Sequence, residues 1–200
     1  MDQTKMRILS AAAKLFDIYG YKGTSVRHIA EEAQVNSALI SYHFHGKQGV
    51  LETLIASYFD TLFRRVAAQE EQDKDAAPYE RLERVVRLYV SFQCENAPIT
   101  RLIQRELSVE SMLAREVLTL YISRWKHGLS RIIEAGIAEG KFLPVPADRI
   151  VLAVISQMTY PFLQAQMVRQ VYDLEPYSEE FALWLQASIM RYLQACLLPA

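Results

Sequence analysis

Residues 23–47 read GTSVRHIAEEAQVNSALISYHFHGK and contain two short amphipathic helical patterns separated by a tight turn. In the first pattern Val26, Ile29 and Ala33 recur at helical spacing, and in the second Ile40 can face a core. Isolated helices this short are marginal in water, so a further helix must support them. The stretch therefore predicts a helix-turn-helix, whose second helix is suited to the major groove of DNA.

The flanking sequence supplies the supporting helices. Apolar periodicity predicts one helix over residues 4–19, stopped by Gly20, and a long helix over about 47–71. We therefore expect an all-α protein. A three-helix, helix-turn-helix DNA-binding head should occupy residues 1–48, and a helical regulatory and dimerisation domain should occupy residues 49–200.

The rest of the chain also favours helices and shows no convincing strand. Pro161 falls inside one predicted helix and should kink or unwind it there. The polar run 69–75 has no large apolar side chain, so we expect a flexible connection and the domain transition around it. The further predicted helices cover residues 79–95, 98–107, 110–138, 147–173 and 178–197.

The charge balance argues against indiscriminate binding of nucleic acid. The chain has 22 Lys and Arg against 23 Asp and Glu, a formal net charge of -1. Residues 1–50 carry six of the basic and four of the acidic residues, so the weak positive potential lies at the N-terminal end. We therefore expect a localised nucleic-acid interface rather than a surface that is basic throughout.

The sequence favours a cytoplasmic, nucleoid-associated protein. Its N-terminus lacks the apolar core of a signal peptide, and the most apolar stretch, 150–163, falls short of the ~20 residues that span a bilayer. Cys94 and Cys196 lie far apart without paired spacing, which predicts buried thiols in a reducing compartment. No membrane contact is expected.

The candidate DNA-contacting residues lie on and beside the second short helix. Small and hydrogen-bonding side chains suit a helix that enters the groove, a tyrosine and two cations suit phosphates, and hydroxyls or amides stand at a helix start. No Arg or Asn lies on this helix, so hydroxyl, methyl, histidine and water-mediated contacts should give the specificity. The candidates are Thr24, Ser25, Arg27, Ser37, Ala38, Leu39, Ser41, Tyr42, His43 and Lys47.

These residues resemble the TetR family of bacterial transcription regulators. The resemblance covers roughly the first quarter of the chain and rests on Lys14-Leu15-Phe16, Tyr19-Gly20-Tyr21, Gly23-Thr24-Ser25-Val26-Arg27, Ile29-Ala30 and Ser41-Tyr42-His43-Phe44, followed by Gly46-Lys47. It implies a homodimer, joined through the last two long helices, that binds palindromic double-stranded DNA with one head on each subunit. It also implies that a small-molecule pocket is often present in the second domain. Ser41 departs from the pattern, because a second aromatic residue is common there.

Within this family, the segments 35–36, 40–42, 46–49, 100–111 and 161–166 are similar to the RefZ-type DNA-binding proteins of spore-forming Bacillus relatives. That resemblance implies binding to chromosomal motifs near the replication origin and a role in chromosome capture and cell division at sporulation. The alternative is a ligand-responsive transcriptional repressor with a small-molecule pocket in the second domain. A further alternative is an interaction protein that uses DNA as an anchor.

Two further sets of candidates lie in the second domain. Polar and aromatic side chains that could line an effector pocket are Tyr89, Arg101, Gln104, Arg105, Tyr121, Trp125, Met158 and Phe162, although such aromatics are more often core. For the polar residues the alternative is a surface salt-bridged helix or a site for a protein partner. The last helix carries a wide apolar stripe that needs a covering surface, and a symmetric dimer supplies one. This predicted interface comprises Phe181, Trp184, Leu185, Ile189, Tyr192 and Leu193.

The sequence favours neither a metal site nor an enzyme. His43 and His45 lack a third nearby ligand, and the pair straddles a helix end. Cys94 and His127 lie outside the strand-turn-helix and glycine-rich contexts of nucleophilic sites, and no phosphate loop is present. We therefore expect no cofactor and no catalysis.

Overall fold

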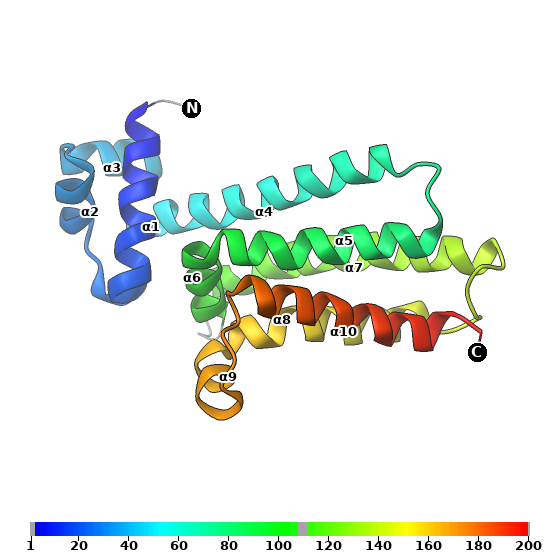
Figure 1. The fold of residues 1–200 in the computed structure, drawn as a ribbon. Coiled ribbons are helices and arrows are strands. Elements are labelled where there is room, and N and C mark those ends of the chain that lie inside the picture. Colours follow the sequence, from blue (N-terminus) through cyan, green and yellow to red (C-terminus); the bar gives the residue numbers. More distant parts are fainter. Residues whose placement is uncertain (1–2, 108–111, 200) are drawn as a thin grey trace. The chain divides into compact units, whose positions relative to one another are not determined.

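The computed structural model describes residues 3–107 and 112–199, and the side chains of residues 106–118 lie outside the described set. Every regular element among these residues is an α-helix, which confirms the predicted all-α fold (Figure 1). The helices are α1 (Gln3–Gly23), α2 (Val26–Ala33), α3 (Ser37–Phe44), α4 (Lys47–Gln72), α5 (Pro78–Glu95), α6 (Ala97–Leu107), α7 (Met112–Ala138), α8 (Ala147–Leu163), α9 (Ala165–Tyr172) and α10 (Glu179–Leu197).

The chain forms two compact units, which we call the head unit and the body unit. The head unit comprises residues 1–61 and 97–109 and so holds α1, α2, α3, the N-terminal part of α4, and α6. The body unit comprises residues 62–96 and 110–200 and holds the rest of α4, α5 and α7 to α10. The head unit takes in α6 because that helix packs against α1.

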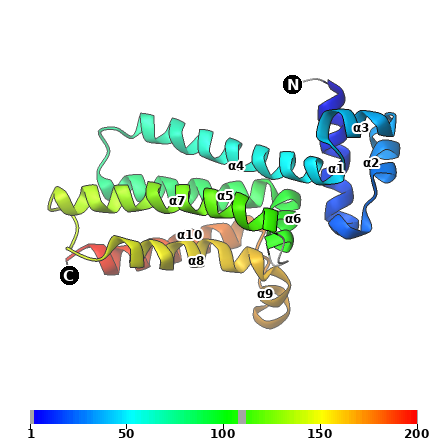
Figure 2. The ribbon, with the colours of Figure 1, turned by 180° about the vertical axis from the view of Figure 1, so that it is seen from behind.

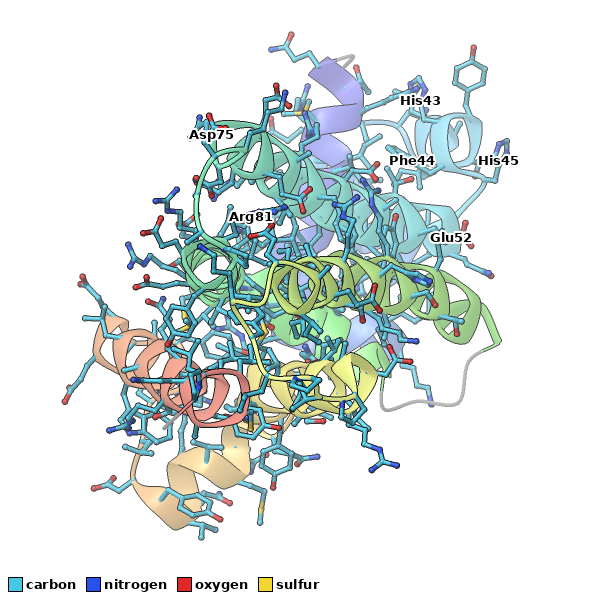
Figure 3. All side chains as sticks on the ribbon, turned by 90° about the vertical axis from the view of Figure 1, so that its right-hand side faces the viewer. His43, Phe44, His45, Glu52, Asp75 and Arg81 are labelled. Atoms are coloured by element: carbon cyan, nitrogen blue, oxygen red, sulfur yellow. The ribbon has the colours of Figure 1, made fainter. Side chains whose placement is uncertain are left out.

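The head unit folds around apolar faces of its short helices. Its largest core side chains, Ile8, Phe16, Ile29, Ile40 and Phe44, are each 5% exposed or less. In Figure 3 Phe44 is turned toward α1 and α4, whereas His45 points away from them. Burial of these faces supplies the stability that helices of eight residues lack on their own.

Capping fixes where α2 and α3 begin and end. Ser25 accepts a hydrogen bond from the His28 amide at the start of α2, and Asn36 accepts one from the Ala38 amide at the start of α3. Gln34 and His45 end the two helices in the left-handed conformation. Each end is therefore set by local hydrogen bonds.

The first helix has the interruption that its sequence predicts. Gly20 lies at φ 73 and ψ 167, which is not helical, and the chain resumes one further turn as far as Gly23. Only glycine adopts this conformation readily, so Gly20 stops the regular helix at the expected residue.

The body unit is a bundle of long helices. α7 packs beside α5 and α8, and α10 packs beside α5 and α8 (Figure 2). Its core includes Val86, Phe92, Leu129, Ile133 and other fully buried side chains. A buried hydrogen bond of 2.9 Å from Gln93 Nε2 to the Met158 carbonyl oxygen joins α5 to α8.

The polar run 69–75 is not a connection between units. Residues 69–72 form the last turn of α4, and the whole run lies in the body unit, whose boundary falls between Thr61 and Leu62. Asp73 is only 3% exposed, forms an ion pair with Arg84 of α5 and accepts a hydrogen bond from Gln69. The prediction of a flexible transition was wrong because the buried carboxylate is paired and holds the turn.

Pro161 does not break the helix at its own position. α8 continues through Pro161 to Leu163, and the interruption comes at Gln164, before α9 begins. A proline removes one amide donor and crowds the preceding turn. Pro161 lies two residues before the last residue of α8, so this loss affects only the C-terminal end of the helix. The Gln164 amide still donates to the Tyr160 carbonyl oxygen and closes the last turn.

The two cysteines are free and half-buried. Burial, together with the nearby charge of Glu95, raises the pKa of the Cys94 thiol to about 11. At pH 8 only about one Cys94 thiol in a thousand is then the reactive thiolate. We expect iodoacetamide to modify Cys94 far more slowly in the folded protein than in concentrated urea, measured by peptide mass spectrometry. Equal rates in the two conditions would contradict the assigned environment.

Among the described residues, no helix combines the length and the apolar character needed to cross a membrane.

Candidate nucleic-acid interface

The exposed face of α3 is polar and small. Ser37, Ala38, Ser41 and Tyr42 are exposed, Tyr42 by 77%. The Tyr42 ring lies against the edge of the His43 ring, with centroids 4.9 Å apart. Of the remaining α3 candidates, Leu39 and His43 are half-buried. The helix thus presents hydroxyls, a methyl group and a rigid phenol along one side.

At the start of α2, Thr24 lies differently from what we predicted, whereas Ser25 is exposed. Thr24 is buried, and its Oγ1 donates to the carbonyl oxygens of Gly20 at 2.9 Å and Leu15 at 3.2 Å. Its hydroxyl therefore has no route to DNA, and that part of the prediction was wrong. The Ser25 hydroxyl is exposed and accepts from the His28 amide, which leaves its own proton free for an outside acceptor.

Arg27 and Lys47 differ sharply in their surroundings. Arg27 is exposed and forms a surface ion pair with Glu31, at 2.9 Å between Nε and Oε1. Lys47 instead donates from Nζ to the carbonyl oxygens of Tyr21 at 2.7 Å and Thr24 at 2.6 Å. A mobile surface pair such as that of Arg27 can be exchanged for a phosphate, whereas the Lys47 ammonium is already engaged.

Two side chains that the sequence analysis missed hold the helix-turn-helix together. Arg7 of α1 donates to the carbonyl oxygens of Ala33 and Gln34, at the C-terminal end of α2. Lys14 forms an ion pair of 2.6 Å with Glu32 of α2, and this hydrogen bond raises the pKa of Lys14. Both are cations on α1 placed near C-terminal groups of α2, where the helix dipole favours positive charge.

The proposed polar residues of an effector pocket lie in the head unit, and the two arginines among them bind α1. Arg101 makes a bidentate ion pair with Asp17, at 2.9 Å from Nε and 2.7 Å from Nη2. Arg105 donates to the Phe16 carbonyl oxygen. Gln104 is buried. The two arginines were therefore misassigned, because their charges are used to tie α6 to α1.

The other pocket candidates, four aromatic residues and Met158, belong to the body unit, and Trp125, Met158 and Phe162 are core residues. Met158 and Phe162 are fully buried, so they fill the bundle rather than line an open site. Tyr89 stacks on Trp125 with centroids 4.7 Å apart, and burial raises the pKa of Tyr89 to about 12. Tyr121 stacks on Phe63, at 5.9 Å between centroids.

A groove of about 800 Å³ lies in the body unit beside α7. Of the candidates, only Trp125 lines it, together with apolar side chains of α4, α5 and α7 that include Phe63, Val85 and Leu129. Arg124 of α7 lies over the Phe63 ring, 4.2 Å from its centroid. Periodicity could not reveal this groove, since its residues follow the same spacing as the core. Its polar lining consists of Glu70, Arg124, Lys126, His127, Ser130, Arg131, Glu134 and Asp148.

The apolar stripe of α10 is covered within the chain. Phe181, Leu185, Ile189 and Leu193 are each 4% exposed or less, because α10 packs on α5 and α8. These four residues are core, and assigning them to a dimer interface was wrong. Of the predicted set, Trp184 is exposed and Tyr192 is half-buried.

Two protein-family profiles match the chain, one at the helix-turn-helix and one over most of the remaining helices. The profile described as "Bacterial regulatory proteins, tetR family" matches residues 8–54, and "Tetracyclin repressor-like, C-terminal domain" matches residues 78–191. YttP of Bacillus subtilis (strain 168), described as a probable HTH-type transcriptional regulator, is 31% identical over 192 residues, covering 92% of this chain and 93% of YttP.

Solved structures share the fold. PfmR, a TetR family transcriptional regulator from Thermus thermophilus, is 27% identical with a TM-score of 0.73, covering 96% of this chain and 97% of its own. The transcriptional regulator FadR from Bacillus subtilis, solved in complex with stearoyl-CoA, is 21% identical with a TM-score of 0.75, covering 94% of this chain and 96% of its own.

These comparisons support the broader prediction and not the narrower one. They give no support to the RefZ-type resemblance or to the role in sporulation and cell division that it implied. The matching proteins are transcriptional regulators rather than enzymes. With both of its domains matched, the chain belongs to the TetR family of DNA-binding transcriptional regulators.

Proposed function

We propose that this regulator binds a palindromic DNA site as a homodimer and places α3 of each subunit in the major groove. The observation that carries the proposal is the exposed polar face of α3, formed by Ser37, Ala38, Ser41 and Tyr42. The caps at both ends of the helix hold this face in one conformation. Two such helices in successive grooves must lie about 34–36 Å apart.

The flanking contacts should go to phosphates. Arg27 can exchange its exposed Glu31 partner for a phosphate oxygen, and Tyr42 carries a hydroxyl on a rigid arm. The exposed Ser25 hydroxyl stands at the start of α2, where the helix dipole also favours an anion. Ser37, Ser41 and the partly exposed His43 then remain for base edges.

The dimer surface should use the outer faces of α8 and α10. Leu152 and Tyr160 of α8 and Leu183 and Trp184 of α10 are each more than 50% exposed. The two helices pack against each other, and their inner faces are buried in the core of the chain. Apolar side chains on neighbouring helices suit a self-complementary patch used twice about a two-fold axis.

The direct test is selection of bound duplexes from a random pool, followed by fluorescence anisotropy. The selected site should be palindromic and should bind at least about 1,000-fold more tightly than a scrambled duplex at physiological salt. Equal affinity for both duplexes would overturn the proposal. Genome-wide mapping would then separate a local regulator, with one neighbouring promoter, from a protein that binds several origin-proximal sites.

Arg27→Ala should weaken binding to all sequences. Loss of one phosphate contact should flatten the slope of log affinity against log salt by about 0.9, as measured by anisotropy titrations at several salt concentrations. Arg87→Ala is the matched control, because Arg87 forms the same kind of surface pair with Glu83, four residues earlier, on α5. An unchanged slope in Arg27→Ala would remove Arg27 from the interface.

We also propose that a ligand bound in the body groove regulates DNA binding. The groove volume of about 800 Å³ falls in the range of small-molecule sites, and its lining combines aromatic with charged side chains. FadR, which shares the fold, was solved with stearoyl-CoA, so this acyl-CoA is the first probe, with free coenzyme A as control. Release of a prebound duplex by stearoyl-CoA alone would support regulation by an acyl chain. No release at saturating probe would exclude this ligand.

A further inference from the structure

The side chain of Lys47 connects the start of α4 to the turn between α1 and α2. Lys47 is the first residue of α4, and its Nζ donates to the carbonyl oxygens of Tyr21 at 2.7 Å and Thr24 at 2.6 Å. The same ammonium lies 4.3 Å from the centroid of the Tyr21 ring. The start of α4 is therefore tied to the turn between α1 and α2 by two hydrogen bonds to a charged donor and a cation–π contact.

The turn that Lys47 holds also sets the start of α2. The buried Thr24 closes the turn from inside, because its hydroxyl donates a hydrogen bond to the Gly20 carbonyl oxygen at 2.9 Å. The next residue, Ser25, caps α2, and Arg27 follows in the first helical turn. Any displacement of the turn would move the α2 groups proposed to bind phosphate relative to α3.

A direct phosphate contact is the competing role for Lys47. An ammonium has three donors, and two of them are used by backbone carbonyls within the head unit. The two roles predict different salt dependence, because only a charge that neutralises phosphate releases counterions from DNA. A positioning charge changes the affinity and leaves the salt slope unaltered.

The geometry points to Lys47 as a positioning residue that fixes the spacing between the α2 start and the recognition helix. This inference rests on the proposed binding of DNA. It assigns to the ammonium a role inside the protein, with the phosphate contacts left to Arg27, Ser25 and Tyr42.

The test compares Lys47→Met with Arg27→Ala on the selected duplex. Methionine keeps an unbranched chain but donates to neither carbonyl, so we expect a loss of affinity of about 10-fold with the salt slope of the wild type. Lys47→Arg should restore most of the affinity, because a guanidinium can donate to both carbonyls and stack on Tyr21. A slope reduced by about 0.9 in Lys47→Met would overturn the inference and assign a phosphate contact.

Thr24→Val supplies a second measurement that removes no charge. It deletes the hydroxyl bond that closes the same turn, so its effect on DNA affinity should be smaller in the Lys47→Met background than in the wild type. Strictly additive effects would contradict a shared positioning role. Far-UV circular dichroism at the assay temperature checks that each variant is folded, and if Lys47→Met is not, Lys47→Gln replaces it in both measurements.

The two proposals fail separately. If the wild-type protein shows no preference for any duplex, DNA recognition itself is wrong. If the wild type binds specifically and the Lys47→Met slope falls, only the positioning role of Lys47 is wrong.

Discussion

Gly49→Ala should destroy the DNA-binding head. A methyl group at Gly49 would lie 1.7 Å from the carbonyl oxygen of Phe44 and 2.8 Å from its carbonyl carbon, and both atoms belong to the backbone. The clash cannot be relieved by a change of rotamer, because the end of α3 would have to move away from α4. Phe44 fills the core of the head unit, so its packing would be lost as well. We expect destabilisation of the head by more than about 3 kcal/mol and loss of specific DNA binding.

Urea unfolding followed by circular dichroism, together with anisotropy on the selected duplex, measures both effects. Gly128→Ala is the control, since Gly128 lies inside α7 and an added methyl group there meets no atom within 4 Å. That variant should be neutral or more stable by up to about 1 kcal/mol, because alanine is the better helix former. A Gly49→Ala protein as stable as Gly128→Ala would show that the α3–α4 junction is not packed as described.

Trp184→Glu should convert the proposed dimer into a monomer. Trp184 is 51% exposed in the isolated chain, and its ring contacts buried Phe181 of the same helix at 5.3 Å between centroids. Its replacement removes a ring at the edge of the core and no fully buried side chain, so the subunit should stay folded. In the proposed dimer it belongs to the apolar patch formed with Leu152, Tyr160 and Leu183, where a buried carboxylate would have no partner. Loss of a tryptophan from the centre of an interface costs roughly 2–4 kcal/mol, so dimer affinity should fall by a factor of about 30 or more.

Light scattering coupled to size exclusion tests this directly against the chain mass of 23.0 kDa. Ile122→Glu provides the control, because Ile122 is also 51% exposed but stands on α7. The monomeric Trp184→Glu protein should also lose most of its preference for a palindrome over a half-site. If Trp184→Glu stays dimeric while Ile122→Glu dissociates, the interface lies on another face of the body unit.

Elements with strong local signals could be predicted from the sequence. α2 and α3 were found because Ser25 and Asn36 cap them and apolar residues recur behind them. Gly20 marked the end of the regular part of α1, since the left-handed conformation there favours glycine. These features depend on neighbours within a few residues, so the sequence contains all the information they need.

The predictions of side-chain roles were wrong where the partner of a charged side chain lies far away in the sequence. Arg101 and Arg105 looked like polar residues of a pocket, yet they bind Asp17 and the Phe16 carbonyl oxygen on α1. Asp73 looked like part of a solvated run, yet it is buried against Arg84. A charged residue has the same sequence pattern whether its partner is water, a phosphate or a distant helix.

The amino-acid sequence by itself determined the helical class of this protein, the helix-turn-helix and the family to which it belongs. Only the tertiary structure decided which apolar face of α10 is core, with Ile189 inside and Trp184 outside. It also decided that Lys47 is engaged by backbone carbonyls while Arg27 remains exposed. Helical periodicity reveals that a face is apolar, but whether the same chain or a second molecule covers that face depends on how the helices pack.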